Sequence, residues 1–436
     1  MNNNAVVSGS SADMFDVCII GAGPGGYRAA EYAAKQGLKV VIIEQGEVGG
    51  TCLNVGCIPT KTYVHSGSFA EARERMAAVV PQLRAGVEGI LSHPNITLVR
   101  GHASFLNAST VKVSGDSVAA CSVCSDTIAA KDMVIATGSE TKWLPIAGRD
   151  DPRVVDSTGL LNFDKLPKRL AIIGAGVIGM EFASVFHRFG SEVTVIEYLK
   201  ECLPALDADI AKRLRKLMEK RGITFRMKTA VENLADIDAD VILMATGRRP
   251  RTEGLNLEAA GITLAPNGAI PVDTSSFLVP SSSSIYAIGD VNGCQMLAHA
   301  AEMQAVRAVN HILGRSDNIR FDIMPAAIFT DPEAACVGAC EGAHVYKAFW
   351  RANGKALAMG EPEGMLKLFA SPSASEGMPA GQGSHILGCH AFGAHAADIV
   401  QEVSVLMCRD TTIEQLRDMV HIHPTLSEIL FSAVQD

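Results

Sequence analysis

The sequence contains no apolar run long enough to cross a membrane. Its most apolar stretches, such as Val17–Ile20, Val40–Ile43 and Leu170–Ile173, are far shorter than the roughly 20 residues of a spanning helix. Basic residues are not in excess either, since the formal net charge is −9, and binding to nucleic-acid phosphates requires a basic surface. The composition therefore predicts no membrane insertion and no nucleic-acid partner.

A secretion signal is also missing. Residues 1–13 are small and polar, without the basic start or apolar stretch of a signal peptide, so we predict a disordered leader and a cytoplasmic protein. The 11 cysteines are odd in number and scattered, which argues against a disulfide framework. A cysteine pair that does form a disulfide in a reducing compartment is more typical of catalysis than of structure.

What the chain does contain is one pattern that occurs twice. An apolar strand, Phe15–Ile20, runs into the glycine motif 21–26 (GAGPGG), then into a helical stretch and a second strand, Lys39–Ile43, that ends at Glu44. Another apolar strand, Arg169–Ile173, runs into the motif 174–179 (GAGVIG), then into a helix and a strand, Glu192–Ile196, that ends at Glu197. In both copies 23 positions separate the first glycine from the terminal acid. The repeat predicts two related βαβ units.

Each copy has the layout of a dinucleotide-binding unit rather than of a glycine-rich turn without a ligand. In such a unit the first glycine makes a tight turn, the second lets the backbone approach a pyrophosphate, and the third lets the helix pack on the strand. The helix N-terminus carries partial positive charge towards the phosphates, and the acid accepts hydrogen bonds from ribose hydroxyls. Two such units predict two bound dinucleotides.

The predicted fold class is α/β, with two Rossmann-like dinucleotide-binding domains and a C-terminal α+β domain. Two later strands are predicted at Asp132–Thr137 and Asp240–Thr246, and each leads into the sequence Ala-Thr-Gly, at 136–138 and 245–247. Each is expected to join the sheet of its own glycine motif. After residue 320 glycine motifs stop, and short strands such as Met365–Phe369 and Ile386–Cys389 alternate with helical stretches. This change in the sequence pattern indicates a separate domain.

Cys52 and Cys57 follow the first βαβ unit directly, in the run 49–61 (GGTCLNVGCIPTK). Two cysteines five positions apart can close a small disulfide loop if the chain kinks, and Gly56 supplies the flexibility. Residues 61–75 have a helical pattern, and a thiol near a helix N-terminus has a lowered pKa, which favours the thiolate that exchanges with disulfides. On these residues alone, two unrelated buried cysteines explain the pattern about equally well.

The run 49–61 closely resembles the signature of the pyridine nucleotide–disulfide oxidoreductases. The resemblance extends from Asp16 to about Leu430, and within the family it is strongest to the members that oxidise dihydrolipoamide. The other motifs that carry it are 21–26, 174–181, 245–248 (ATGR), 288–290 (IGD), 297–302 (LAHAAE) and 421–428 (HIHPTLSE).

The resemblance implies FAD in the first unit and NAD in the second. Protein-bound dihydrolipoamide would be oxidised to lipoamide while NAD is reduced to NADH. Glu197 favours NAD over NADP, because an acid at this position binds ribose hydroxyls and repels a 2′-phosphate. The residues implied to contact cofactors are Gly21, Gly23, Gly26, Glu44, Thr51, Ala136, Thr137, Gly138, Asp290 and Ala298 for FAD, and Gly174, Gly176, Gly179, Glu197 and Gly247 for NAD.

The same resemblance implies roles for the cysteines and for an ion pair. Cys57 would be the sulfur that faces the flavin, and Cys52 the sulfur that exchanges with the substrate. Lys61 would lie near the reactive flavin nitrogen and pair with Glu181, since a buried charge without a partner costs several kcal/mol.

A base and its orienting acid are implied near the C-terminus. His423 would take the proton from the incoming dithiol, and Glu428 would orient its ring. The His421-x-His423 spacing also suits a metal pair, but no cysteine or acid of matching spacing accompanies it, so no metal site is predicted. The His423–Pro424 bond is a candidate for the cis form.

In this family the base comes from the neighbouring subunit, so a homodimer is implied. The lipoyl group would arrive on another protein, either an acyltransferase or a glycine-cleavage carrier protein. The predicted domains are a leader (1–13), the first part of the FAD domain with the redox cysteines (14–150), the NAD domain (151–270), a return segment of the FAD domain (271–323) and the dimerisation domain (324–436).

Three segments depart from the family pattern. Residues 226–240 are too short for the expected β-meander, 338–347 are also short, and 371–384 resemble an inserted surface loop. Four cysteines match no family role: Cys121, Cys124, Cys336 and Cys340. These departures leave two alternatives open, namely another flavin disulfide reductase of the same family, or a catalytically impaired flavoprotein component of a multienzyme complex.

Overall fold

The computed structural model describes residues 14–115, 126–372 and 383–435, which form two compact units. The first unit combines the chain up to Pro59 with residues 77–140 and 248–319, and the second combines residues 60–76, 141–247 and those from Arg320 onward. Each unit thus contains one of the two glycine motifs. No helix in the described part of the chain is both long and apolar enough to span a membrane.

A parallel sheet lies at the centre of the first unit, with the strand order β3-β2-β1-β6 and with β14 beside β6. Strand β1 is buried along almost its whole length, as expected for a parallel sheet that is covered on both faces. Two strands, β4 and β5, extend the sheet in antiparallel pairing. The bounds are β1 Phe15–Ile20, β2 Val40–Glu44, β3 Ile96–Arg100, β4 His102–Asn107, β5 Thr110–Ser114, β6 Thr127–Ile135 and β14 Ile285–Ala287.

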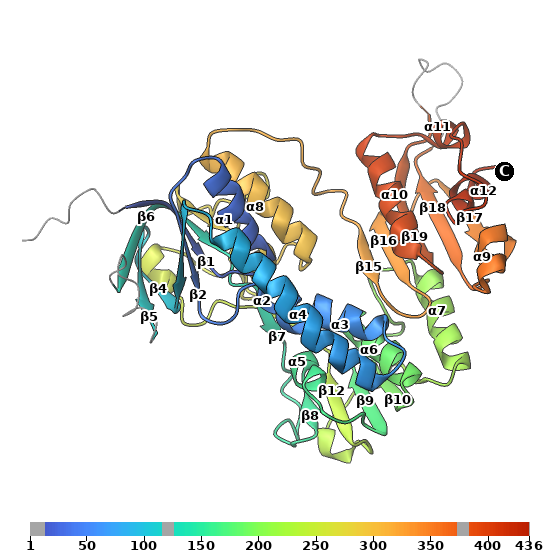
Figure 1. Ribbon diagram of the computed structural model, residues 1–436. Coiled ribbons are helices and arrows are strands. Elements are labelled where there is room, and N and C mark those ends of the chain that lie inside the picture. Colours follow the sequence, from blue (N-terminus) through green and yellow to red (C-terminus); the bar gives the residue numbers. More distant parts are fainter. Residues whose placement is uncertain (1–13, 116–125, 373–382, 436) are drawn as a thin grey trace, which may run out of the picture. The chain divides into compact units, whose positions relative to one another are not determined.

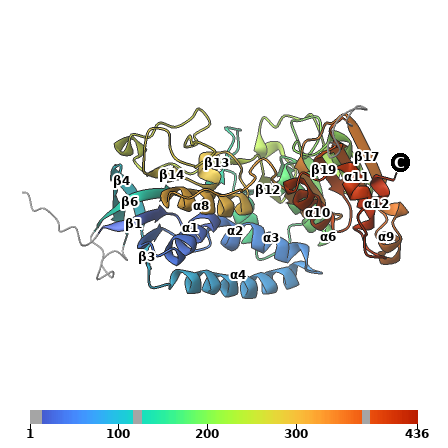
Figure 2. The ribbon, with the colours of Figure 1, turned by 90° about the horizontal axis from the view of Figure 1, so that it is seen from above.

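Two helices, α1 (Pro24–Lys35) and α8 (Ala298–Ile312), pack side by side next to this sheet (Figures 1 and 2). The buried side of α1 consists of glycine and alanine only, so the two backbones approach closely. Tyr27 contacts Glu302 and Tyr32 contacts Asn310, and this order shows that the helices run parallel. Their N-termini therefore face the same region.

The second unit contains a parallel sheet of the same type, in the order β11-β10-β9-β12-β8. Helices α6 and α7 cover one face with apolar side chains, and Asp207 caps α7 by accepting hydrogen bonds from two backbone amides. The bounds are β8 Val154–Val155, α5 Ser157–Leu161, β9 Arg169–Ile173, α6 Val177–Arg188, β10 Glu192–Ile196, α7 Ala208–Lys220, β11 Thr224–Arg226 and β12 Val241–Met244.

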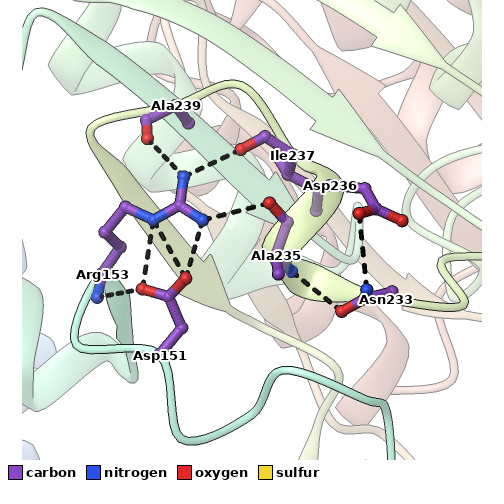
Figure 3. Close-up of polar contacts among 7 residues, drawn as sticks. All are labelled: Asp151, Arg153, Asn233, Ala235, Asp236, Ile237 and Ala239. Atoms are coloured by element: carbon purple, nitrogen blue, oxygen red, sulfur yellow. Dashed lines mark hydrogen bonds and ion pairs between the residues drawn. The ribbon is translucent and has the colours of Figure 1, made fainter.

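The segment between β11 and β12 has no β-meander. All of its residues are described, and it forms only the short turn η2 (Leu234–Asp236). Leu234 and Ile237 pack on the second face of the sheet. Figure 3 shows how the loop is held: Arg153 forms an ion pair with Asp151 and donates hydrogen bonds to backbone carbonyls of the loop, including those of Ile237 and Ala239. This loop, rather than the expected β-meander, therefore covers part of the second face of the sheet.

Part of this second face remains open. A cavity of about 610 Å³ lies over it, and Thr194, Arg226 and Glu232 are among its lining residues. Strand β10 matches this arrangement, because its buried valines point to the helix-covered face, whereas Glu192 and Thr194 line the cavity.

The C-terminal part of the second unit is an antiparallel sheet in the order β15-β16-β19-β18-β17. Lys367 on β18 donates to Asp207 at 2.7 Å, and His390 Nδ1 on β19 accepts from the Asp207 amide at 2.9 Å, which ties this sheet to α7. The bounds are β15 Ala326–Ile328, β16 Ala334–Gly338, β17 His344–Phe349, α9 Gly354–Met359, β18 Met365–Ala370, β19 Ile386–Phe392, α10 Ala396–Cys408, α11 Ile413–Arg417 and α12 Glu428–Ala433.

The predicted helix over residues 61–75 is wrong in its bounds. The chain forms α3 (Cys57–Val64), breaks at residues 65–68, and then forms α4 (Phe69–Leu91). Some predictions fall wholly or mostly outside the described residues: the leader 1–13, Cys121 and Cys124, and most of the loop 371–384.

Candidate functional site

The first glycine motif forms a tight loop between β1 and α1. A Cβ atom on Gly26 would lie 1.8 Å from the carbonyl oxygen of Gly21, so helix and loop contact each other directly. At Gly23 the nearest atom to such a Cβ, on Gly50, is 3.9 Å away, so the loop has room at this position. This is the arrangement that lets a backbone approach a pyrophosphate.

Glu44 closes the loop from the end of β2. Its carboxylate accepts hydrogen bonds from the backbone amide of Ala22 at 2.7 Å and from that of Gly46 at 2.8 Å. A carboxylate oxygen can accept more than one hydrogen bond. Glu44 is therefore held beside the glycine loop, where a ribose hydroxyl would find an acceptor.

The second glycine motif repeats this geometry between β9 and α6. A Cβ on Gly179 would lie 2.0 Å from the Gly174 oxygen, whereas one on Gly176 would meet nothing within 4 Å. Glu197 accepts from the amide of Ala175 at 2.7 Å and from that of Leu199 at 2.7 Å. Backbone, helix terminus and acid thus have the same relations in both copies.

The first unit also carries a carboxylate, Asp290, at the edge of its sheet. Strand β14 leads into the turn η4 (Gly289–Asn292), which carries Asp290. Because β14 pairs with β6 in parallel, Asp290 lies at the same sheet edge as the segment 136–138 that follows β6. Gly25 at the start of α1 lies close to Ala301 in the first turn of α8, so both helix N-termini point to this edge. The residues fit a dinucleotide with a pyrophosphate.

The cysteines lie on two short helices. Cys52 is half-buried in α2 (Gly50–Val55), and Cys57 is exposed at the first position of α3. Gly50 packs on the first glycine loop, because a Cβ there would lie 2.7 Å from the Gly23 Cα. The cysteine segment and the dinucleotide loop are therefore in contact.

Two residues that sequence reasoning missed fix this segment. The Asn54 amide donates to the carbonyls of Val48 and Gly50, at 2.9 Å each, and Asn54 Oδ1 accepts from Arg84 Nε at 3.0 Å. Arg84 comes from α4, so nothing in the local sequence pattern signals the contact.

Tyr27 is a third residue that the sequence did not single out. Its hydroxyl lies 3.3 Å from the Glu302 carboxylate. Burial raises the pKa of Tyr27, and the charges of Glu302 and Cys52 raise it further. The phenol therefore stays protonated close to Cys52.

Lys61 and Glu181 form the predicted ion pair. Lys61 Nζ lies 3.0 and 2.9 Å from the two Glu181 oxygens, and it also lies 4.7 Å from the ring centre of Phe329. Glu181 is only 4% exposed and also accepts from the Phe329 amide at 2.9 Å. The carboxylate is thus fixed from two sides, and it fixes the ammonium one turn after Cys57 on α3.

His423 and Glu428 also meet as predicted. His423 Nδ1 lies 2.9 Å from Glu428 Oε1, and the Thr425 amide donates to Glu428 Oε2 at 2.8 Å. That backbone hydrogen bond and the His423 contact lower the pKa of Glu428. An ionised Glu428 accepts a hydrogen bond from Nδ1–H, which leaves Nε2 of the neutral ring as an acceptor.

The surroundings of His423 are apolar and open. The His423–Pro424 bond is cis, as is Asp331–Pro332. Val420 is 99% exposed and Ile422 is 79% exposed, so two large apolar side chains lie on the surface just before the histidine. Among the described residues, no group of three or more His, Cys, Asp or Glu side chains is placed to bind a metal ion.

Comparison with protein families agrees with this geometry. The family described as "Pyridine nucleotide-disulphide oxidoreductase" matches residues 15–305, and the family described as its dimerisation domain matches residues 324–434. Together the two matches cover nearly all of the described chain.

Individual proteins match over almost their full lengths. "Dihydrolipoyl dehydrogenase, mitochondrial" of Pisum sativum is 35% identical over 99% of this chain and 93% of its own. "Dihydrolipoyl dehydrogenase" of Chlamydia muridarum is 34% identical over 96% and 95%. Among solved structures, the "HOCl-induced flavoprotein disulfide reductase RclA from Escherichia coli" has a TM-score of 0.86 and 31% identity, over 96% of this chain and 99% of the other.

Proposed function

We propose that this chain, which belongs to the pyridine nucleotide–disulphide oxidoreductases, is a dihydrolipoyl dehydrogenase that oxidises protein-bound dihydrolipoamide and reduces NAD. The observation that carries the proposal is the combination of two glycine loops, each with the geometry of a dinucleotide site, and a cysteine segment that packs on the first loop. The full-length likeness to proteins named dihydrolipoyl dehydrogenase supports it.

FAD would occupy the first unit and NAD the second. Gly23 would face the FAD pyrophosphate in the loop that Gly21 and Gly26 shape, while Glu44 and Asp290 would accept from FAD hydroxyls. The other residues assigned to FAD are Thr51, Ala136, Thr137, Gly138 and Ala298, and those assigned to NAD are Gly174, Gly176, Gly179, Glu197 and Gly247. When bound, FAD supplies the two-electron chemistry that connects a dithiol to NAD.

The chemistry of this chain would begin at a Cys52–Cys57 disulfide. A substrate thiolate would attack Cys52 and form a mixed disulfide, with Cys57 as the leaving thiolate. The second substrate thiol would then release lipoamide and leave both cysteines reduced. The electron pair would then pass on to NAD⁺, and the Cys52–Cys57 disulfide would form again. Overall, dihydrolipoamide and NAD⁺ give lipoamide, NADH and one proton.

His423 would accept the proton of the incoming dithiol at Nε2. Glu428 supports this role, because it accepts a hydrogen bond from Nδ1–H and stabilises the ring when the ring is charged. Lys61, fixed by Glu181, would supply positive charge beside the cofactor. In a homodimer, for which the matched dimerisation domain is the evidence, His423 would act at the partner's site, with Val420 and Ile422 covered by the interface.

The partner that delivers the lipoyl group stays a prediction, either an acyltransferase of a 2-oxoacid complex or a glycine-cleavage carrier. A cytoplasmic location is likewise a prediction from the sequence.

A second function has one observation in its favour. The likeness to the disulfide reductase RclA, at a TM-score of 0.87 for its Cu(II) complex, allows this chain to act as a reductase of a different acceptor. In that case electrons would flow from NADH to the acceptor, and dihydrolipoamide would be a poor substrate.

Steady-state kinetics of the FAD-loaded dimer would separate the two functions. With dihydrolipoamide and NAD we expect NADH formation, which Cys52→Ser abolishes while bound FAD remains. His423→Gln should slow it by about 10²–10⁴-fold. Absence of NADH formation by the flavin-loaded wild type would reject the dehydrogenase, and unchanged turnover of His423→Gln would reject the assigned base.

A further inference from the structure

Asp290 belongs to a polar chain that links three distant segments of the first unit. Ser139 Oγ donates a hydrogen bond to Asp290 Oδ2. Arg248 donates from Nε to the same Oγ at 2.7 Å and from Nη2 to the Ser139 carbonyl at 2.7 Å. Ser139 is 3% exposed, so water hardly competes for these hydrogen bonds.

The direction of the Ser139 hydrogen bond follows from its partners. A hydroxyl has one proton to donate and two lone pairs to accept with. Arg248 can only donate, so its Nε–H occupies a lone pair and leaves the Ser139 proton for the carboxylate. Hydrogen bonds to charged groups are the strong ones, and a nearby guanidinium also offsets the negative charge of Asp290.

The turn that carries Asp290 is held independently from its other side. Gln304 is fully buried, and its Oε1 accepts from the Gly289 amide at 2.7 Å and from Asn292 Nδ2 at 2.8 Å. Asp290 is thus fixed through its backbone by Gln304 and through Oδ2 by Ser139. Within the described residues no side chain or amide donates to Asp290 Oδ1, which leaves this oxygen available to a ligand hydroxyl.

We propose that Ser139 and Arg248 are positioning residues for the cofactor contact of Asp290. Arg248 orients the Ser139 hydroxyl, Ser139 holds Oδ2, and Oδ1 is thereby aimed at a hydroxyl of the bound flavin dinucleotide. The inference rests on the proposed function, in which Asp290 accepts from FAD. In this arrangement Ser139 and Arg248 both act through Asp290.

A double-mutant cycle on FAD affinity tests the inference. FAD would be titrated into apoprotein of the wild type, Ser139→Ala, Asp290→Asn and the double variant. We expect Ser139→Ala to raise the Kd for FAD about tenfold, the size of one charge-assisted hydrogen bond. In the Asp290→Asn background the same substitution should change the Kd by less than about twofold. Arg248→Gln should repeat the loss seen in Ser139→Ala.

Ser276→Ala is the matched control. Ser276 is 4% exposed, lies in the same unit, and donates to the Asp273 carboxylate at 3.2 Å, so its loss should leave the Kd for FAD unchanged. Additive effects of Ser139→Ala and Asp290→Asn would overturn the inference, because a purely structural role would persist without the carboxylate.

Two further outcomes separate this inference from the proposed function. If Asp290→Asn weakens FAD binding but Ser139→Ala does not, only the positioning role is wrong. If Asp290→Asn leaves FAD affinity unchanged, the assigned contact of Asp290 with FAD is wrong and the inference falls with it. Dehydrogenase activity does not enter the titration, so a chain that binds FAD yet forms no NADH would leave this result intact.

Discussion

The two dinucleotide sheets differ in what lies beyond β6 and β12, the strands that pair with β1 and β9 on the side away from β2 and β10. In the first unit β6 has β14 as its outer neighbour, which leads to Asp290, and α8 runs parallel to α1. In the second unit β12 has the two-residue strand β8 in that place. The glycine loops and their acids are nearly the same in both. The glycine motif alone therefore does not distinguish the proposed FAD unit from the proposed NAD unit, and the elements around it differ.

The second sheet also differs in how its free face is covered. A loop with Leu234 and Ile237, without strands of its own, packs on this face, and Arg153 secures that loop. The Glu197 carboxylate accepts from the amides of Ala175 and Leu199, which lie outside this loop, whereas the Thr229 amide of the loop donates to the Glu197 backbone carbonyl at 2.9 Å. Loss of the meander is therefore compatible with an intact NAD site.

The third glycine of each motif gives the largest expected effect. In Gly26→Ala and Gly179→Ala the new Cβ would lie 1.8 and 2.0 Å from a carbonyl oxygen, so helix and loop must separate. We expect Gly26→Ala to purify without FAD. Gly179→Ala should keep FAD but raise the KM for NAD by roughly 100-fold, equivalent to about 2.7 kcal/mol.

Flavin content and NAD kinetics check this pair. Gly86→Ala is the control, because a Cβ there meets nothing within 4 Å and alanine favours a helix by about 0.5–1 kcal/mol over glycine. Flavin loss in Gly179→Ala, with unchanged flavin in Gly26→Ala, would contradict the assignment of the two units.

Glu197 should give the next largest effect. Glu197→Gln keeps the shape but removes the charge that repels a 2′-phosphate, so the ratio of kcat/KM for NAD over NADP should fall by about tenfold, or about 1.4 kcal/mol. Glu192→Gln, at the opposite end of the same strand and on the cavity wall, should leave the ratio unchanged. An unaltered ratio in Glu197→Gln would rule out this acid as the basis of NAD preference.

Arg153 tests how the shortened domain is held together. Arg153→Ala leaves three carbonyls of the loop without their donor, and we expect the free energy of unfolding of the second unit to fall by more than it does in a variant that loses one exposed ion pair. Urea denaturation of the apoprotein measures this. Arg213→Ala removes an exposed pair with Asp209 on α7 and should cost only about 0.3–0.5 kcal/mol. Equal losses of unfolding free energy in the two variants would mean that Arg153 does not secure the loop between β11 and β12.

The smallest expected effect is a pH dependence confined to the second unit. Burial lowers the pKa of His390, so the unfolded chain takes up a proton at a higher pH than the folded chain. Stability should therefore fall as pH drops below the ordinary histidine pKa of about 6.5, with a slope of at most about 1.4 kcal/mol per pH unit. Unfolding of His390→Gln, followed from pH 7 to pH 5, should show a shallower slope than the wild type. An identical slope would assign the acid sensitivity to other groups.

Much of the fold could be predicted from local pattern. Three strands, Phe15–Ile20, Arg169–Ile173 and Glu192–Ile196, have the bounds that the sequence predicts, because apolar or β-branched runs end at glycines or acids. The break between α3 and α4 was missed, since a short polar interval does not disturb helical periodicity.

Some contacts of the candidate site could be predicted and others could not. The contact of His423 with Glu428 and the pair of Lys61 with Glu181 were both accessible only through the family resemblance. Ser139 and Arg248 could not be found from the sequence, because their contact joins segments more than 100 positions apart. Such contacts depend on the tertiary fold and leave no spacing to recognise.

The central claim is that dihydrolipoamide reduces a Cys52–Cys57 disulfide beside the flavin. Anaerobic titration of the FAD-loaded dimer with dihydrolipoamide, followed by visible absorption, tests it most directly. We predict a long-wavelength band after one equivalent, from the Cys57 thiolate against oxidised flavin, and no such band in Cys57→Ser. Bleaching of the flavin without that band, to the same extent in wild type and Cys57→Ser, would contradict the account.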